Sequence, residues 1–289
     1  MTLDLAVASD GPTRRRLRRH LPVHGIAVHR LDVGGGIEEL APADPDASRP
    51  YDVGFVFPSR TVEGDVRAAM LAIPWVNDRE AILTTRNKAG SLARLAAAGM
   101  PIPRTVHVSS PVDTDAVVDA YRRFDGPVVV KPNATSRGTG HVLVREVDSF
   151  RGVVDYLELI HSFPATGDRS FILQEYVEGA RDLRLTVIDG EVAAAVERRL
   201  PEDAPGAWVK NVHRGASAVA VEPPPVAVDL AEQAAAELGV PFLGVDLLVT
   251  PGRAFVLEVN GRPTVDREEK YPSDFYDRLA RLIKSAASD

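Results

Sequence analysis

Short apolar runs alternate with amphipathic segments of helical period over the first 77 residues. Strands are predicted at residues 3–8, 25–33, 51–57 and 73–77, with helices at about 12–21 and 62–72. The stretch rich in Pro, Asp and Ala, residues 34–50, is predicted to be a surface loop. Because strands that alternate with helices favour a parallel sheet, we expect a small α/β domain over residues 1–77.

The pattern changes after residue 77. Residues 78–98 predict one helix, with Asp78 as its N-cap and Gly99 as its stop. A central lobe over about 100–177 is predicted to contain strands from residue 105 and at 127–131, 141–147 and 171–177, and helices at about 112–124 and 149–163. A last lobe over about 178–289 is predicted to contain strands at 183–189 and 191–200, a helix at 226–238, a hairpin at 246–260 and a final helix at 274–288. We therefore expect residues 78–289 to form an α+β domain of two lobes.

The predicted hairpin near the C-terminus places polar side chains on an otherwise apolar element. Glu258 and Asn260 are two residues apart, so in a strand both lie on one face, with Leu257 and Val259 on the other. A solvated polar face would give the same alternation, so the pattern alone leaves both interpretations open.

The turn of this hairpin decides what lies opposite these residues. If residues 251–253 form a three-residue turn, Asp246 lies directly opposite Glu258. Two carboxylates and the amide oxygen of Asn260 are the ligands that Mg²⁺ prefers, completed by water and phosphate oxygens. The hairpin is therefore a candidate metal site.

Composition is that of an ordinary globular protein, with 289 residues of which 45% are hydrophobic and 26% are charged. The chain has no cysteine, so disulfides, thiolate metal sites and a cysteine nucleophile are excluded. The net charge of −7 argues against nucleic-acid binding. No apolar run approaches the roughly 20 residues that span a bilayer, and no signal-peptide pattern begins the chain, so we expect a cytoplasmic protein without a membrane partner.

Residues 14–20 form a basic run, although the net charge of the chain is negative. Five of its seven residues are arginine. We interpret the run as an exposed face of the first helix, with contact to a polyanionic partner as the alternative.

Candidate anion-binding residues gather in the central lobe. Lys131 ends an apolar strand just before the polar loop at 133–140, which contains Gly138 and Gly140. The backbone N–H groups of such a loop can close over phosphate oxygens, although an ordinary hairpin loop has the same composition. Lys88 lies on the central turns of the predicted 78–98 helix, where a solvated face is the alternative.

Further polar residues follow the next strands. The segment Gln174-Glu175-Tyr176-Val177-Glu178-Gly179 leaves an apolar strand and can present backbone groups to an adenine edge and a carboxylate to a ribose. Asp182 and Arg184 lie on one face of the following strand, and Arg198 ends the strand after it. Arginines beside an acidic metal site suit a phosphoryl group, because guanidinium pairs bidentately with phosphate.

The order of these features resembles the ATP-grasp superfamily. The segments VVVKP, QEYVEG, RDLRLTVIDGEVAAAVERR, NVHRG, GVDLL and LEVN, together with Lys88, are most similar to its RimK-like branch of amino-acid and glutamate ligases. The similarity covers roughly residues 75–289. It implies an ATP-grasp fold, in which two lobes clamp ATP, behind the α/β N-terminal domain.

The resemblance also implies roles for particular residues. The implied ATP site comprises Lys88, Lys131, Gly138, Gly140, Gln174, Glu175, Tyr176, Val177, Asp182 and Lys210. Asp246, Glu258 and Asn260 are implied to bind Mg²⁺, with Mn²⁺ as an alternative. The residues implied to act on the transferring phosphoryl group are Lys131, Arg198 and Asn211. Expected substrate contacts are Arg60, His213, Arg214 and Arg262.

Three positions depart from the family pattern. Val209 stands where the family often has arginine, with Lys210 adjacent as a point charge. Arg137 lies in the polar loop, and Arg262 stands where related ligases often have a small residue. These departures leave the implied ATP and metal residues in place and leave the amine acceptor open.

The implied activity is that of an ATP-dependent carboxylate–amine ligase working through an acyl-phosphate. The implied substrates are a small carboxylate and an amine, or a peptide, and a homodimer or homotetramer is expected. The loops at 133–140 and 201–215 are expected to close as lids that exclude water. Two other classes stay open: an ATP-grasp small-molecule kinase, and a nucleotide-binding module without turnover.

Overall fold

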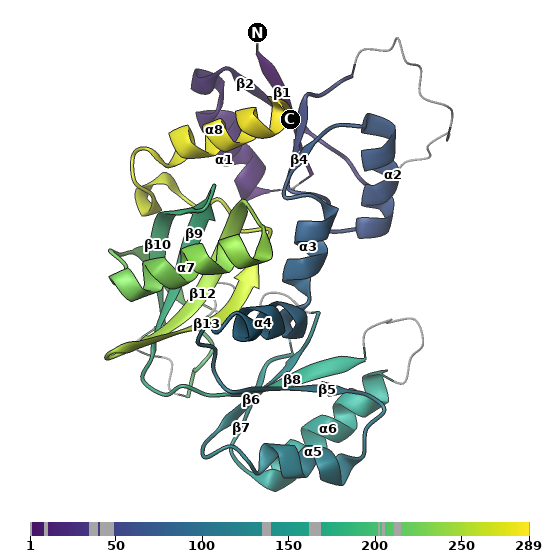
Figure 1. The fold of residues 1–289 in the computed structure, drawn as a ribbon, viewed down its shortest axis with the longest axis vertical. Helices are drawn as coiled ribbons and strands as arrows, with labels where there is room; N and C mark the ends of the chain where they lie inside the picture. The colour runs from purple at the N-terminus through teal and green to yellow at the C-terminus, as the bar shows by residue number, and fades with distance from the viewer. Residues whose placement is uncertain are drawn as a thin grey trace.

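The computed structural model describes residues 2–8, 11–34, 40, 49–134, 140–161, 169–201, 203, 206–210 and 215–288. Three sheets follow one another along the long axis of the molecule (Figure 1). A parallel sheet lies at the top of the view, a five-stranded antiparallel sheet lies in the middle, and a four-stranded antiparallel sheet lies at the bottom.

The N-terminal sheet is parallel, as predicted, with the strand order β2-β1-β3-β4. Its strands and flanking helices are β1 (Leu3–Val7), α1 (Pro12–His20), a 3₁₀ turn η1 (Pro22–His24), β2 (Ile26–Arg30), β3 (Val53–Phe55), α2 (Thr61–Leu71) and β4 (Trp75–Val76). β3 is shorter than predicted because Val56 takes the left-handed conformation, with φ of 57°. The regular strand ends at this residue, although the backbone N–H groups of Val56 and Phe57 still donate to the carbonyl oxygens of Val76, at 2.8 Å, and Asn77, at 2.9 Å.

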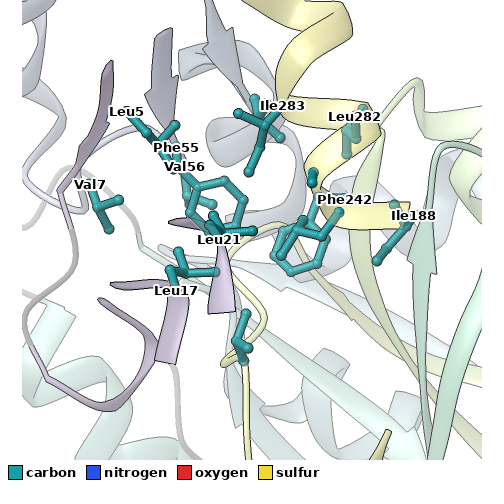
Figure 2. Close-up of a cluster of buried hydrophobic side chains, with 14 of the residues drawn as sticks. Leu5, Val7, Leu17, Leu21, Phe55, Val56, Ile188, Phe242, Leu282 and Ile283 are labelled. Carbon is teal, nitrogen blue, oxygen red and sulfur yellow. The ribbon is translucent and has the colours of Figure 1, made fainter. Parts of the chain in front are cut away.

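The core of the N-terminal sheet includes side chains from the far end of the chain. Helix α8 (Phe275–Ser288) packs on this sheet (Figure 1). Figure 2 shows Leu5 and Phe55 of the first strands close to Ile283 of α8 and Phe242 of the middle sheet. The boundary at residue 77 stays a prediction, and the structure adds that the last helix returns to the first sheet.

Asn77 joins the N-terminal part to the middle sheet. Its buried side-chain Nδ2 donates to the carbonyl oxygens of Phe242, at 2.5 Å, and Gly261, at 2.6 Å. Its Oδ1 accepts from the backbone N–H of Phe242 at 3.1 Å. One side chain therefore satisfies three backbone groups from distant segments.

The prediction of one helix over residues 78–98 is wrong. Asp78 is the expected N-cap, and its side chain accepts from Ala81 N, but the helix divides into α3 (Arg79–Arg86) and α4 (Lys88–Ala97). Asn87, between them, has an extended backbone with φ of −81° and ψ of 90°. Its Oδ1 accepts from Gly90 N at 2.9 Å, so Asn87 is the N-cap of the second helix.

Replacing Asn87 with alanine is expected to lower the free energy of unfolding by about 1 kcal/mol, the usual cost of losing an N-cap side chain. The change also removes the acceptor for Asn133 Nδ2, which donates to Asn87 Oδ1 at 3.0 Å. Asn87→Asp keeps an acceptor at the cap and is the matched control. Urea denaturation measures the difference, and equal stability of both variants and the wild type would contradict the capping role.

The two antiparallel sheets form the rest of the molecule. The middle sheet has the order β11-β10-β9-β12-β13 and packs against α7. Its elements are β9 (Arg181–Ile188), β10 (Glu191–Arg199), β11 (Ser217–Ala220), α7 (Pro225–Leu238), β12 (Phe242–Thr250) and β13 (Arg253–Asn260), followed by the 3₁₀ turn η4 (Glu268–Lys270). The lower sheet has the order β5-β8-β6-β7 and packs against α5 and α6. Its elements are β5 (Thr105–Ser109), α5 (Thr114–Tyr121), β6 (Val128–Pro132), β7 (Val142–Val144), α6 (Val147–His161) and β8 (Ser170–Glu175).

The basic run is only partly an exposed face. Arg15, Arg18 and Arg19 are exposed, as interpreted from the sequence. Arg16 instead points inward, and its guanidinium donates to Val265 O at 2.5 Å and lies 3.6 Å from the Asp266 carboxylate. This arginine ties α1 to the segment that precedes α8.

Over the part of the chain that the structure describes, no helix is long and apolar enough to cross a membrane.

Candidate functional site

A pocket lies where the lower and middle antiparallel sheets meet. Its lining comes from β6, β8, β9, β10, β12 and β13 and from residues 208–210. It encloses about 120 Å³. A larger cavity of about 570 Å³, between β10 and η4, is lined mainly by alanine, valine and proline side chains and holds none of the predicted site residues.

One side of the pocket is apolar and contains two aromatic rings. Tyr176 and Trp208 meet edge to face, with ring centroids 6.2 Å apart. Val177, Leu248 and Leu257 complete this wall. An aromatic and aliphatic wall of this kind suits a heterocycle. The predicted adenine-contacting residues Glu175, Tyr176 and Val177 all line the pocket.

Lys131 is buried at the end of β6, with 5% of its surface exposed. Its Nζ donates to Gln174 Oε1 at 2.6 Å, and Gln174 Nε2 donates to Thr105 Oγ1 at 3.0 Å. Burial lowers the pKa of Lys131 to about 8; the Glu258 carboxylate opposes this shift, and the neighbouring Lys88 ammonium adds to it. Gln174 also lines the pocket, and its amide holds the lysine in place.

Lys88 is buried at the first residue of α4, so its predicted place on the central turns of a helix is wrong. The break at Asn87 moves it to a helix N-terminus. Its Nζ donates to Asn133 O at 3.2 Å, and Asn133 Oδ1 accepts from Ala89 N at 2.8 Å. The end of β6 and the start of α4 are thereby fixed together, which brings both lysines to one region.

Acidic and basic side chains face one another across the middle sheet. Asp182 on β9 lies opposite Arg198 on β10, and Arg198 Nη2 is 2.6 Å from Asp182 Oδ1. Asp246 on β12 lies opposite Arg184 on β9 and also opposite Glu258 on β13. The predicted site residues of four adjacent strands therefore meet on one face.

The two buried aspartates differ in their pKa. Burial raises the pKa of Asp182 to about 6, with Arg198 opposing the shift and Asp246 adding to it. Burial also acts on Asp246, but the guanidinium groups of Arg184 and Arg198 outweigh it and hold the pKa of this carboxyl below its ordinary value. Asp246 is therefore an anion at neutral pH although only 1% of its side-chain surface is exposed.

The pairing of Asp246 with Glu258 is confirmed, but the predicted turn is wrong. Thr250 pairs with Arg253, so the turn has two residues, and a bulge between the Asp246 and Leu247 pairings restores the register. Leu257 is the extra residue of the bulge and lines the pocket beside Glu258. Its predicted position on the opposite face is therefore wrong, whereas Val259 does face the core.

The donor set of the hairpin fits a hard cation. Asp246 and Glu258 supply carboxylates, and Asn260 Oδ1 accepts from Arg262 N at 2.8 Å, which leaves that oxygen a second lone pair. Among the described residues no group of three His, Cys, Asp or Glu side chains could hold a metal. A cation here would therefore complete its coordination with the amide, water and phosphate oxygens, as Mg²⁺ commonly does.

The remaining predicted residues lie apart from this centre or outside the described residues. Arg60 precedes α2, is mostly exposed and lies 3.6 Å from Glu63. Arg262 donates to Val56 O at 3.4 Å and to Phe57 O; burial and the nearby Arg86 lower its pKa to about 10. Lys210 lines the pocket, and its Nζ donates to Ala180 O at 2.6 Å. Gly140 is described, with φ of 77°, whereas Gly138, Asn211, His213 and Arg214 lie outside the described residues.

Two features of the site, Trp208 and the ion pair of Arg184 with Asp246, were not predicted from the sequence. Trp208 comes from a loop without periodicity, so no pattern predicted its place in the apolar wall. The pairing of Arg184 with Asp246 joins two strands that are 62 residues apart. Strand periodicity predicted that Asp182 and Arg184 share one face. It could not predict that β12, which carries Asp246, pairs with this strand.

The comparisons with known proteins agree on a family. A RimK-like ATP-grasp domain matches residues 85–283. A probable alpha-L-glutamate ligase of Stenotrophomonas maltophilia (strain K279a) is 33% identical over 193 residues, which are 66% of this chain and 62% of that relative. Another, from Citrobacter koseri, is 33% identical over 216 residues, which are 74% of this chain and 68% of that relative. The chain thus matches less than two thirds of the length of the first relative.

Solved structures share the whole fold. D-cycloserine synthetase DcsG has a TM-score of 0.72 at 21% identity, over 97% of this chain and 99% of that one. The ATP-grasp ligase PsnB has a TM-score of 0.72 at 18% identity, over 99% of each chain. D-alanine–D-alanine ligase from Bacillus anthracis has a TM-score of 0.69 at 14% identity, over 100% of this chain and 98% of that one. The expected ATP-grasp fold is confirmed, and with the family match over most of the sequence, the chain belongs to the RimK-like ATP-grasp family.

Proposed function

We propose that the protein is an ADP-forming ligase that joins a carboxylate to an amine, with an amino acid such as glutamate as one substrate. The observation that carries this proposal is the junction between the two antiparallel sheets. An apolar wall, the buried Lys131 and Arg198 meet there beside the carboxylate pair of the β12–β13 hairpin, and the buried Lys88 is near enough to Lys131 to lower its pKa. The names of the 33% identical relatives support glutamate as the amino acid.

In this proposal the apolar wall binds the adenine, and Lys131 and Lys88 neutralise phosphate oxygens. Arg198 lies on the pocket side of the carboxylates, where it can pair with the transferring phosphoryl group. Bound at Asp246, Glu258 and Asn260, Mg²⁺ would supply charge neutralisation and orient the phosphates. The substrate's carboxylate then takes up the phosphoryl group with release of ADP, and the amine displaces phosphate from the acyl carbon. The roles of Asn211, His213 and Arg214 stay predictions, as does an assembly of two or four copies.

ADP formation from Mg-ATP in the presence of glutamate and a panel of amines tests the proposal, with products identified by mass. A condensed product with stoichiometric phosphate supports the ligase. A phosphorylated single substrate would instead identify a kinase, and nucleotide binding without turnover would identify a regulatory module.

The pH dependence of nucleotide binding follows from Lys131. The folded-state pKa of about 8 lies below the ordinary 10.5, so the ammonium is present below that pH and is lost as pH rises through about 8. Affinity for ADP is therefore expected to fall above pH 8, approaching about tenfold per pH unit, because the neutral amine no longer pairs with phosphate. Lys131→Arg keeps its charge and should remove this fall. Calorimetry between pH 6.5 and 9.5 measures both proteins, and parallel curves would contradict the assignment.

A further inference from the structure

Arg184 makes the most complete ion pair of the site. Its Nε lies 2.5 Å from Asp246 Oδ1, and its Nη2 lies 2.7 Å from Asp246 Oδ2. The two residues are directly opposite on β9 and β12, so the planar guanidinium forms a bidentate ion pair with the carboxylate. These two parallel hydrogen bonds fix the orientation of the Asp246 carboxylate.

The oxygen atoms of Asp246 are almost fully used. Besides the two bonds from Arg184, Oδ2 lies 3.0 Å from Arg198 Nη2. A carboxylate offers about four lone-pair sites, so the two arginines leave one, on Oδ1. The Glu258 side chain, the other carboxylate of the proposed metal site, also lies within hydrogen-bond reach of Asp246. Asp246 can therefore offer a cation one oxygen, in an orientation set by Arg184.

The two arginines are placed differently. Arg198 is shared, because its guanidinium also lies 2.6 Å from Asp182 Oδ1, and it lines the pocket. The Arg184 guanidinium donates two hydrogen bonds to Asp246, and Arg184 is not among the described residues that line the pocket. Arg198 can leave Asp246 for a phosphate while it keeps Asp182. Arg184 also feels the charge of Glu258, but both hydrogen bonds described for its guanidinium are to Asp246.

Asp246 also needs this partner. Its side chain is 1% exposed, and the side chain of Glu258 lies within hydrogen-bond reach. A buried carboxylate beside a second, partly buried one is unfavourable unless cations and hydrogen bonds compensate it. Arg184 supplies both.

We propose that Arg184 is a positioning residue for the metal site, which holds Asp246 in the orientation that binds the cation and stays on it when the nucleotide is bound. The proposal rests on the proposed function, because it takes the metal ligands from there. Groups that hydrogen-bond a metal ligand typically account for 10–100-fold in metal affinity.

The test is a titration of Mn²⁺ into the protein of residues 1–289 with saturating ADP, monitored by electron paramagnetic resonance. Arg184→Lys keeps the charge and loses the bidentate pairing, and it is expected to weaken Mn²⁺ binding about 10–100-fold while ADP binding in the absence of metal is unchanged. Arg181→Lys is the matched control, because Arg181 lies on the same strand and pairs bidentately with Glu197 at 3.0 and 3.2 Å. The control should bind Mn²⁺ as the wild type does.

Equal Mn²⁺ affinity of Arg184→Lys and the wild type would overturn the proposal. Tighter binding by the variant would also overturn it, because it would mean that Arg184 competes with the metal. If the wild type itself bound no Mn²⁺ with ADP present, the metal assignment of the proposed function would fail as well. Loss of binding in Arg184→Lys with an unchanged melting temperature separates the positioning effect from unfolding.

Discussion

Replacing Glu258 with glutamine is expected to reduce ADP formation by about 10²–10³-fold, the size of effect that follows removal of one group that stabilises transition-state charge. Glutamine has nearly the same shape, so the β12–β13 pairing should persist. What it lacks is the negative charge that, in the proposed site, would hold a cation together with Asp246 at the edge of the pocket. The nucleotide would still occupy the apolar wall.

The expected signature separates catalysis from binding. In Glu258→Gln, ADP binding without metal should be retained, and Mn²⁺ binding detected by paramagnetic resonance should be lost. Glu237→Gln on α7 is the control, since Glu237 lies outside the pocket and its carboxylate is 3.9 Å from Arg94. Full turnover by Glu258→Gln would mean that the hairpin is only a solvated polar face.

Replacing Asn77 with alanine is expected to cost about 3 kcal/mol or more of folding free energy. The change leaves the carbonyls of Phe242 and Gly261 and the N–H of Phe242 without their partner, and each unsatisfied buried group costs about 1–3 kcal/mol. Asn77 also has φ of 56°, which asparagine tolerates better than alanine.

A glycine variant distinguishes these two causes. Asn77→Gly adopts the left-handed backbone without strain, so it should recover about 1 kcal/mol relative to alanine and remain well below the wild type. Chemical denaturation measures all three proteins. If Asn77→Gly were as stable as the wild type, the hydrogen bonds from Asn77 to Phe242 and Gly261 would not contribute to the stability of the protein.

Much of the fold was predictable because the chain obeys local rules. The alternation of strands and helices predicted the parallel sheet, and Asp78 predicted the start of α3. The division at Asn87 was not predicted, because the helical composition continues through this residue; in the structure Asn87 also bonds to the distant Asn133, a contact that no local pattern specifies. Strand β11 was missed because most of its side chains are exposed, so it shows no apolar face.

The candidate site was predictable where it depends on strand periodicity. Glu258 and Asn260 stand on one strand, and the order of the family's segments located Lys131 and Asp182. The bulge at Leu257 contains no glycine, so the sequence carries no signal for it. Strict strand alternation therefore assigned Leu257, which lines the pocket, to the wrong face. Arg184 acquires its place only when β9 and β12 pair, and no local pattern specifies that contact.

The most direct test of the ligase is the release of ADP and free phosphate from Mg-ATP, with amino acids offered singly and in pairs and the products weighed by mass spectrometry. We expect release to require two substrates, with glutamate among the productive ones, and the product mass to equal their sum minus water. A phosphorylated product of one substrate, or nucleotide binding without turnover on any pair, would contradict this expectation.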